Sequence, residues 1–351
     1  MPIPRRSLLA AGLVAPFVSS CATKNGTVDN DNVSSLAMKL GISATYATIS
    51  GGKPNAAVAL SNGSSHPVHA NSVFQAASLT KPVTAFVALA LAREGKLDLN
   101  APASRYLPDG YRHRQNPAAS PPKFDLVKAG VLAGIPVASL LNHTSGLPNW
   151  TGAQLTPGFE AGKRWQYSGE AYVLIQSIIS AITGQDFEAV VDRYVFEPLA
   201  MDHSRLRLTD DMRGQIASST GWLPWSRPIE FAEANAAASL HTTAGDYAKL
   251  LARWVNDETL LALTLSKPVA TDASLGLSWG YGWGIESAHG GPYLWHWGNN
   301  PGYRAFAMVS ATSGNGFTLL TNCERGLALA RPLARATVPS EHNVFRFHML
   351  G

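Results

Sequence analysis

The stretch that organises the chain is FQAASLTKPVTAFVALALAREGKLDLN, residues 74–100, in which a serine and a lysine three positions apart precede a long apolar run. Two other S-x-x-K matches occur, SGGK at residues 50–53 and SPPK at residues 120–123. Matches of this kind arise by chance in a chain of 351 residues. The pattern therefore has to be judged from its surroundings.

Residues 83–92, VTAFVALALA, are apolar on nearly all sides and predict a helix that is buried over most of its surface. Pro82 limits where this helix begins, because proline lacks an N–H, clashes with the carbonyl four residues earlier and is tolerated only in the first turn. The residue four positions earlier is Ser78. The serine is therefore expected at the helix N-terminus, where free N–H groups and the helix dipole favour developing negative charge. Lys81 would project from the same face.

The two rival matches lack such a framework. Ser50 and Lys53 flank two glycines between the strand-like segments GISATYATIS and AAVALS, so we expect them at a hairpin turn. Ser120 is followed by two prolines, which exclude a helical face shared with Lys123. Only the first match remains a candidate for catalysis.

Strand-like segments lie at both ends of the chain, with mostly helical segments between them. The expected strands of the C-terminal third are YGWGIES, YLWHWG, RAFAMVS and GFTLLTN, and the expected helices of the middle include EAYVLIQSIISAIT and DFEAVVDRYVF. We therefore predict an α+β fold with an antiparallel sheet flanked by helices. The sheet domain would comprise residues 36–105 and 240–349, and a mostly helical subdomain, residues 106–239, would be inserted between them.

The N-terminal segment MPIPRRSLLAAGLVAPFVSSCATKNG has the layout of an export signal, with a basic start, an apolar part and small residues before Cys21. The apolar part is shorter than the roughly 20 residues that span a bilayer. Arg5 and Arg6 resemble part of a twin-arginine signal, and the residues before Cys21 resemble a bacterial lipobox. We predict an export signal at residues 1–20 and a polar tether at residues 21–35. Cys21 would carry the lipid of a periplasmic or membrane-anchored lipoprotein.

Composition narrows the function classes. Hydrophobic residues make up 46% of the chain, which excludes a disordered protein. The formal charge of +4 falls to +2 without Arg5 and Arg6, too small a bias to indicate nucleic acid as a partner. The sequence shows no His-rich or Cys-rich ligand spacing, so we expect neither a metal nor an organic cofactor. Cys323, in the segment FTLLTNC, is expected to be a buried structural cysteine.

Catalysis by Ser78 needs a base within hydrogen-bond reach, because an unassisted hydroxyl is a poor nucleophile. Lys81 can be that base where desolvation and neighbouring cationic groups lower its pKa. Chemistry of this type combines S-x-x-K with a second polar triplet and with a third triplet of K-T-G type. The candidates for these elements are YSG at residues 167–169, before an expected helix, and WHWG at residues 295–298, on an expected strand.

From about residue 72 to residue 322 the sequence resembles the serine hydrolases that include class C β-lactamases, D-alanyl-D-alanine peptidases and related esterases. Besides FQAASLTK, YSG and HWGNNPGYR, the resemblance rests on GKLDLNAPASRYLP, LLNHTSGLP, FEPLAMDHS and SLHTTAGDYAKL, whose order and spacing are together highly specific. It implies a serine hydrolase that forms an acyl-enzyme on Ser78. The implied substrate is a small ester, amide or β-lactam, or a short peptide.

The resemblance also implies roles for individual residues. Lys81 would take or relay the proton of Ser78, and Tyr167 would exchange protons with the serine and then with the leaving group. His296 would supply a cationic or hydrogen-bonding group at the edge of the cleft. The backbone N–H groups of Ser78 and Asn299 would form the oxyanion hole.

Two positions depart from the family pattern. Gly169 stands where the family usually has Asn, and Trp297 stands where the family usually has a small hydroxyl residue. Trp297 and Gly298 lie beside the oxyanion position and are expected to bind substrate, with Trp297 as a wall of the pocket. These departures favour an esterase-like or altered amidase specificity over an efficient β-lactamase or carboxypeptidase. Arg304 could restore carboxylate binding from the neighbouring strand, or it could face solvent.

Two other functions stay open at this point. One is a cell-wall D-amino-acid peptidase, which would deacylate slowly, and the other is a catalytically silent protein that binds peptidoglycan or a partner. Each residue also has a structural interpretation: Ser78 as a helix N-cap, Lys81 as a solvated lysine, and Tyr167 and His296 as core residues. His143, in the segment HTSG, is expected to be structural.

Overall fold

The structure is a computed structural model that describes residues 30–61, 67–117, 119, 121–219 and 228–350. The expected export signal, the expected lipid-bearing Cys21 and the rival Ser120 lie outside these residues. Within the described part of the chain, none of the helices combines the length and the apolar character that a membrane span requires.

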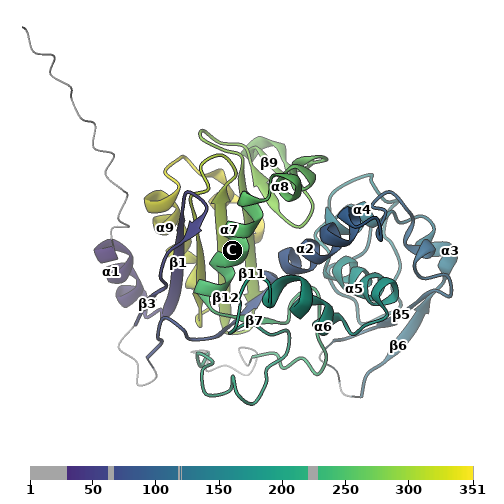
Figure 1. Ribbon diagram of the computed structural model, residues 1–351, viewed down its shortest axis with the longest axis horizontal. Helices are drawn as coiled ribbons and strands as arrows, with labels where there is room; N and C mark the ends of the chain where they lie inside the picture. The colour runs from purple at the N-terminus through teal and green to yellow at the C-terminus, as the bar shows by residue number, and fades with distance from the viewer. Residues whose placement is uncertain (1–29, 62–66, 118, 120, 220–227, 351) are drawn as a thin grey trace, which may run out of the picture.

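A large antiparallel sheet forms the centre of the fold (Figure 1). Within the described residues its nine strands run in the order β2-β1-β13-β12-β11-β10-β9-β8, with β3 also paired to β1. The two ends of the chain meet in this sheet, since β1 pairs with β13 from Ala44 opposite Thr321. The predicted α+β fold, with a sheet formed from both chain ends, is confirmed. The strand bounds are β1 Ala44–Ser50, β2 Lys53–Pro54, β3 Val58–Leu60, β8 Val269–Asp272, β9 Leu277–Trp279, β10 Gly284–Glu286, β11 Tyr293–Asn300, β12 Tyr303–Ser310 and β13 Gly316–Thr321.

Helices cover both faces of the sheet. On one face α1 (Asn30–Leu40) packs against α9 (Ala330–Thr337), and on the other α7 (Ala244–Asn256) packs against β1 and β13. Helix α1 begins inside the segment that we expected to be a tether. Its Val33 is only 2% exposed and joins the core under α9, so apolar spacing overrides the polar composition of this segment.

A mostly helical lobe lies beside the sheet (Figure 1). It contains the two helices expected from the sequence, the second of which ends in a π-helical turn over Asp192–Phe196. A short hairpin, absent from our expectations, projects from the same lobe. The bounds are α3 Ala129–Leu132, α4 Val137–Leu141, α5 Gly169–Thr183, α6 Phe187–Val191, β5 Tyr111–Arg114 and β6 Phe124–Val127.

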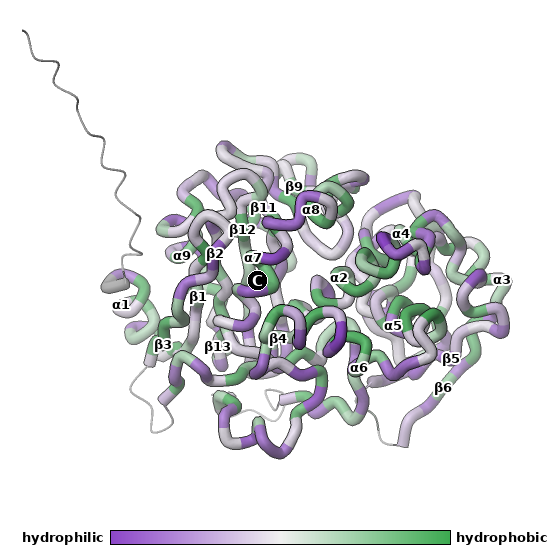
Figure 2. The backbone as a smooth tube through the Cα atoms, viewed as in Figure 1, coloured by the Kyte–Doolittle hydropathy of each residue, from purple (hydrophilic) through white to green (hydrophobic). Residues whose placement is uncertain are grey.

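Helix α2 (Thr80–Arg93) joins the two lobes. It packs against α5, α6 and α8 (Glu258–Leu265), and nearly every residue from Thr80 to Leu91 is buried, as its apolar sequence predicts. Figure 2 shows that hydrophobic residues follow this helix into the space between the lobes. A two-stranded sheet of β4 (Phe74–Ala77) and β7 (Leu240–Thr242) leads into its N-terminus.

The expected strand YGWGIES is shorter than its pattern predicts. Only Gly284–Glu286 forms β10, and the residues before it turn back toward β9. Gly282 has a φ of 87°, in the left-handed region that favours glycine. A Cβ at this glycine would lie 2.4 Å from Cβ of Ala85 in α2. Close contact with α2 therefore bends this segment, although its strand-like sequence pattern predicts an extended backbone.

A buried ion pair holds the C-terminal segment on the sheet. His342 and Glu286 are almost completely buried, and Nδ1 of His342 lies 2.6 Å from Oε2 of Glu286. Nε2 of the same ring lies 2.6 Å from the carbonyl oxygen of Val338. Both neighbours are acceptors, so both ring nitrogens must carry hydrogen. Burial disfavours the charged ring, but the bonds to Glu286 and Val338 outweigh it and raise the pKa of His342.

This pair should make stability depend on pH. A histidine whose pKa is raised in the folded protein stabilises it most below its unfolded pKa, about 6.5, and that contribution is lost as pH rises through the folded value. The His342→Gln variant should lower the free energy of unfolding by about 3 kcal/mol at pH 6, because it leaves a buried carboxylate without its cation. Urea unfolding of both proteins from pH 5.5 to 9 checks this. A difference that does not shrink as pH rises would contradict a charged His342.

Candidate active site

Ser78 follows a strained residue at the junction of β4 and α2. Ala77 has a φ of 50°, which is unusual for a residue with a Cβ, and the pairing of β4 with β7 shifts register between Gln75 and Ala77. The side chain of Thr80 stabilises this turn, since its hydroxyl donates to the carbonyl of Ala77 at 2.6 Å and accepts the N–H of Leu240 at 3.0 Å. The turn presents Ser78 at the N-terminal end of α2, as Pro82 predicted.

Lys81 lies directly behind Ser78 and is completely buried. Its Nζ is 3.0 Å from Oγ of Ser78 and donates to the carbonyl of Ala237 at 2.8 Å. It forms no ion pair with a carboxylate in the described part of the chain. Burial without a counter-ion lowers the pKa of Lys81 well below the ordinary lysine value. Burial therefore favours the neutral amine more than in an exposed lysine, and a neutral amine can accept a proton.

Tyr167 closes the other side of this buried amine. Nζ of Lys81 lies 4.7 Å from the centre of the Tyr167 ring. Burial raises the pKa of Tyr167, and the nearby Ser78 hydroxyl acts in the opposite direction. The phenol is thus neutral and carries a proton. Its hydroxyl lies beside the Ser78 hydroxyl and has no other hydrogen-bond partner among the described residues, so it can bind a reacting group.

His143 holds the segment that carries Tyr167. Its Nδ1 accepts the N–H of Ser168 at 3.1 Å, and its ring lies 4.5 Å from that of Tyr167. Burial, together with the nearby Lys81 and His296, lowers the pKa of His143 well below the ordinary value. The ring is therefore neutral and serves as an acceptor at this position. This arrangement agrees with the structural role expected from its sequence.

Gly298 allows strand β11 to approach the serine. A Cβ at this residue would lie 2.2 Å from the carbonyl oxygen of Ala76 in β4, so only glycine fits. Strand β10 pairs with β11 only as far as Trp295, and among the described residues no other strand pairs with the later part of that edge. Ser78, Asn299 and Asn300 line one cavity of about 380 Å³. The predicted oxyanion donors are thus on the wall of the same cleft.

His296 differs from its prediction. It is completely buried rather than placed at the edge of the cleft, and its Nδ1 donates to the carbonyl of Trp297 at 2.8 Å. Burial, then the proximity of Lys81, lowers the pKa of His296 to about 3. The cationic form is therefore disfavoured, because a charge here would share an apolar region with the amine of Lys81. The other predicted role, a hydrogen-bonding group, stays a prediction. Its Nε2 is a buried acceptor without a hydrogen-bond partner among the described residues.

Neither Trp297 nor Arg304 lines the cavity of Ser78. Neighbouring residues of a strand point to opposite faces, so Trp297 projects away from α2 and does not line the cavity of Ser78. It packs against the Tyr167 ring, with centres 4.9 Å apart. Arg304 forms an ion pair with Glu324 and donates to the carbonyl of Asn300 at 3.0 Å. Its charge is already neutralised.

Trp150 explains the departure at Gly169. A Cβ at Gly169 would lie 2.7 Å from Cζ2 of Trp150 and 2.7 Å from the carbonyl oxygen of Asn149. The indole, 41% exposed, therefore occupies the space in which the family's asparagine would stand. Trp150 also lines the cavity of Ser78, together with Phe231. Sequence reasoning missed this residue, because nothing in the segment PNWTG indicates which way its indole points.

A buried histidine fixes the hairpin wall of the cleft. Nδ1 of His113 lies 2.7 Å from Asp125, and Nε2 lies 3.2 Å from Glu170 in the first turn of α5. Burial disfavours its charged form, but the hydrogen bonds to Glu170 and Asp125 prevail and raise the pKa of His113. The hairpin is thereby attached to the helix that follows Tyr167. Gln115, at the end of β5, lines the cavity of Ser78 from this hairpin.

Metal-binding groups are not gathered in the described ranges. No cluster of three or more His, Cys, Asp or Glu side chains there could hold a metal ion. Cys323 is a buried free thiol, as expected.

Comparison with known proteins gives a consistent picture. A family model described as Beta-lactamase matches residues 38–338. Penicillin-binding protein 4* of Bacillus subtilis (strain 168) is 24% identical over 322 residues, covering 80% of this chain and 66% of that protein. Esterase EstB of Burkholderia gladioli is 29% identical over 165 residues, 38% of each protein. The chain thus spans less than two thirds of the length of these curated relatives.

A solved structure shows the same fold. A class C beta-lactamase aligns with a TM-score of 0.71 at 17% identity and covers 88% of this chain and 93% of that protein.

The contact between Gly169 and Trp150 can be tested by stability. Gly169→Ala should lower the free energy of unfolding by about 2 kcal/mol, because the added methyl overlaps both the indole and a backbone carbonyl. In a double-mutant cycle, Trp150→Ala should remove part of that cost and leave the part caused by Asn149. Additive effects in urea unfolding would contradict the contact.

Proposed function

The chain belongs to the beta-lactamase family, and we propose that it is a serine hydrolase that forms an acyl-enzyme on Ser78. The observation that carries this proposal is the buried amine of Lys81, 3.0 Å from Oγ of Ser78 and without a described carboxylate partner. A lysine in that setting loses its proton readily and can then act as a general base. Ser78 itself is partly exposed to a cleft, where a substrate can reach it.

In the first half of the reaction, Oγ of Ser78 attacks the carbonyl carbon of the substrate and its proton passes to Nζ of Lys81. The oxyanion lies between the N–H groups of Ser78 and Asn299, where losing one donor typically costs about 10²- to 10³-fold in rate. As the bond to the leaving group breaks, the hydroxyl of Tyr167 protonates the departing oxygen or nitrogen. Lys81 then returns its proton to Tyr167.

In the second half, water attacks the acyl carbon and its proton passes to the same basic groups. The second tetrahedral intermediate collapses, and Oγ of Ser78 leaves with a proton. The acid is released and the free hydroxyl is regenerated. Lys81 and Tyr167 thus each begin and end the cycle with the protons they held at the start.

The walls of the cleft favour a small ester with an apolar acyl group. Trp150 and Phe231 line the cavity of about 380 Å³ around Ser78. Trp150 fills the space of the family's asparagine, and Trp297 stands where the family has a small hydroxyl residue but does not line this cavity. The cleft therefore lacks both polar groups that an amide or β-lactam substrate would use, so we rank esterase activity first.

We also propose that the protein is exported and that Cys21 tethers it to a membrane. The support is the layout of the N-terminal segment, with its basic start, apolar part and small residues before the cysteine. The substrate would then be a small molecule or short peptide outside the cytoplasm.

Substitution of the nucleophile tests the proposal directly. Ser78→Ala should abolish labelling by a fluorophosphonate and lower kcat/KM for p-nitrophenyl acetate by about 10³-fold or more, because the variant lacks the proposed nucleophile. Ser50→Ala, at the rival match on the β1–β2 hairpin, is the matched control and should behave as the wild type. Equal labelling of the wild type and the Ser78→Ala variant would contradict the assignment.

The pH profile tests the role of Lys81. Since the base must be neutral and its pKa is lowered, kcat/KM for p-nitrophenyl acetate should fall as acid protonates Lys81 and reach its plateau well below the ordinary lysine pKa, about 10.4. Lys81→Met should lower kcat/KM by about 10²- to 10⁴-fold. Lys96→Met, at an exposed lysine, should leave the profile unchanged. A rate that still rises at the ordinary lysine pKa would show that Lys81 is not the neutral base.

The lifetime of a penicillin adduct separates the enzyme subclasses. If the protein is an esterase or a β-lactamase, fluorescent penicillin should either fail to label Ser78 or be released within seconds. A label that stays on Ser78 for minutes or longer would favour the cell-wall peptidase instead. The readout is gel fluorescence of the wild type and the Ser78→Ala variant over time.

A further inference from the structure

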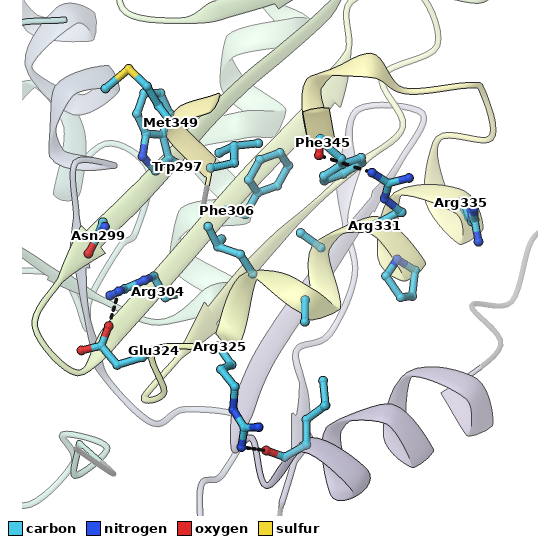
Figure 3. Close-up of a pocket in the computed structure, with 16 residues that line it drawn as sticks. Trp297, Asn299, Arg304, Phe306, Glu324, Arg325, Arg331, Arg335, Phe345 and Met349 are labelled. Atoms are coloured by element: carbon cyan, nitrogen blue, oxygen red, sulfur yellow. Dashed lines mark hydrogen bonds and ion pairs between the residues drawn. The ribbon is translucent and has the colours of Figure 1, made fainter. Parts of the chain in front are cut away.

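A second cavity lies on the far face of the sheet, next to the catalytic cleft. Its volume is about 680 Å³, and it is bounded by β11, β12, α9 and the C-terminal residues (Figure 3). Asn299 lines both this groove and the cavity that contains Ser78. Asn299, the residue that follows Gly298, therefore lies between the two spaces.

The groove has an apolar bed. Phe345 and Met349, both partly exposed, form it from the C-terminal segment, and Trp297 and Phe306 of the sheet lie at its floor, almost completely buried (Figure 3). Phe306 and Trp297 are opposite each other on β12 and β11, so their side chains share one face. An extended hydrocarbon could lie along this bed.

Positive charge is concentrated at the end of the groove far from Asn299. Arg331 and Arg335 lie four residues apart on α9, and both are exposed (Figure 3). Arg331 is held over the Phe345 ring at 5.4 Å. In the described part of the chain, neither arginine pairs with a carboxylate. Near Asn299, by contrast, Arg304 is neutralised by Glu324. Arg325 also lines the groove without a carboxylate partner among the described residues, and it donates to the carbonyl of Leu40. The arginines without a carboxylate thus lie along the side of the groove away from Asn299, and an anion is attracted there and not to the catalytic end (Figure 3).

The position of Tyr167 decides which part of the substrate reaches the groove. In the proposed mechanism this tyrosine protonates the leaving group, so the leaving group departs on its side of Ser78. Trp297 packs against the Tyr167 ring and is also part of the apolar bed. A leaving group longer than the cleft would continue past Asn299 into the groove.

We propose that this groove binds the leaving group of the substrate, and that this group is an extended apolar chain with a terminal carboxylate or phosphate. The proposal rests on the proposed function for the position of the scissile bond. The substrate would thus be an amphiphilic ester or amide whose anion lies remote from the bond that is cleaved.

The test compares acetate release from ω-acetoxydodecanoate, below its micellar concentration, with release from its methyl ester, which lacks the charge. The wild type should prefer the carboxylate by about tenfold in kcat/KM, as two partly exposed ion pairs can supply. In the Arg331→Ala/Arg335→Ala variant the preference should fall to about one, while Arg331→Lys/Arg335→Lys should retain most of it. Arg105→Ala, at an exposed arginine near α2, should keep the full preference.

Chain length provides an internal control. Acetoxyacetate carries its carboxylate beside the scissile bond, where it cannot reach the arginines. Its kcat/KM should therefore not exceed that of its methyl ester. Equal turnover of ω-acetoxydodecanoate and its methyl ester by the wild type would overturn the proposal. So would a preference that the double alanine variant retains.

Failure of the proposed function would give a different result. If no acetate is released from any ester, the hydrolase proposal fails. Ligand binding to the inactive Ser78→Ala protein, measured by calorimetry, then tests the groove independently of catalysis. Tighter binding of ω-acetoxydodecanoate than of its methyl ester, lost in the double alanine variant, would support the anionic groove. Equal binding of the two would contradict it.

Discussion

The rest of the site depends on the contact between the buried amine of Lys81 and the hydroxyl of Ser78. This amine has no carboxylate partner among the described residues. Lys81 is completely buried in a helix that is apolar nearly all round, and its amine donates to the carbonyl of Ala237. A charge in that position would have to be desolvated, and no carboxylate of the described residues balances it. The fold therefore stabilises the neutral amine, and the neutral amine is what nucleophilic catalysis by a serine requires.

Two lobes have to meet closely for this contact to become a site. Gly298 lets β11 approach the carbonyl of Ala76, and Gly282 lets the β9–β10 turn contact α2 at Ala85. In the helical lobe, His143 accepts the N–H of Ser168 and so holds Tyr167 in place, and Trp150 packs against Gly169. A larger side chain at any of the three glycines would push its neighbour away, so the geometry of the cleft depends on small residues as much as on the polar ones.

Much of the fold and the nucleophile could be predicted from the sequence. The apolar helix and Pro82 identify Ser78 because their constraints are local: a proline ring can occupy only the first turn. The walls could not be predicted in the same way. His296 and Trp297 are neighbours on one strand and point to opposite faces, and the sequence does not show which face meets the cleft. Trp150 was missed because its role depends on contact with Gly169, a residue distant in the sequence.

The central claim is that Lys81 is a neutral amine in the resting protein. The most direct test is a ¹³C and ¹⁵N NMR titration of side-chain amines in lysine-labelled protein, with the Lys81 signal assigned by its loss in Lys81→Met. The account predicts that Lys81 is already uncharged at a pH where the exposed lysines, with pKa values of about 10.4, remain charged. A Lys81 signal that titrates together with those of the exposed lysines would contradict it.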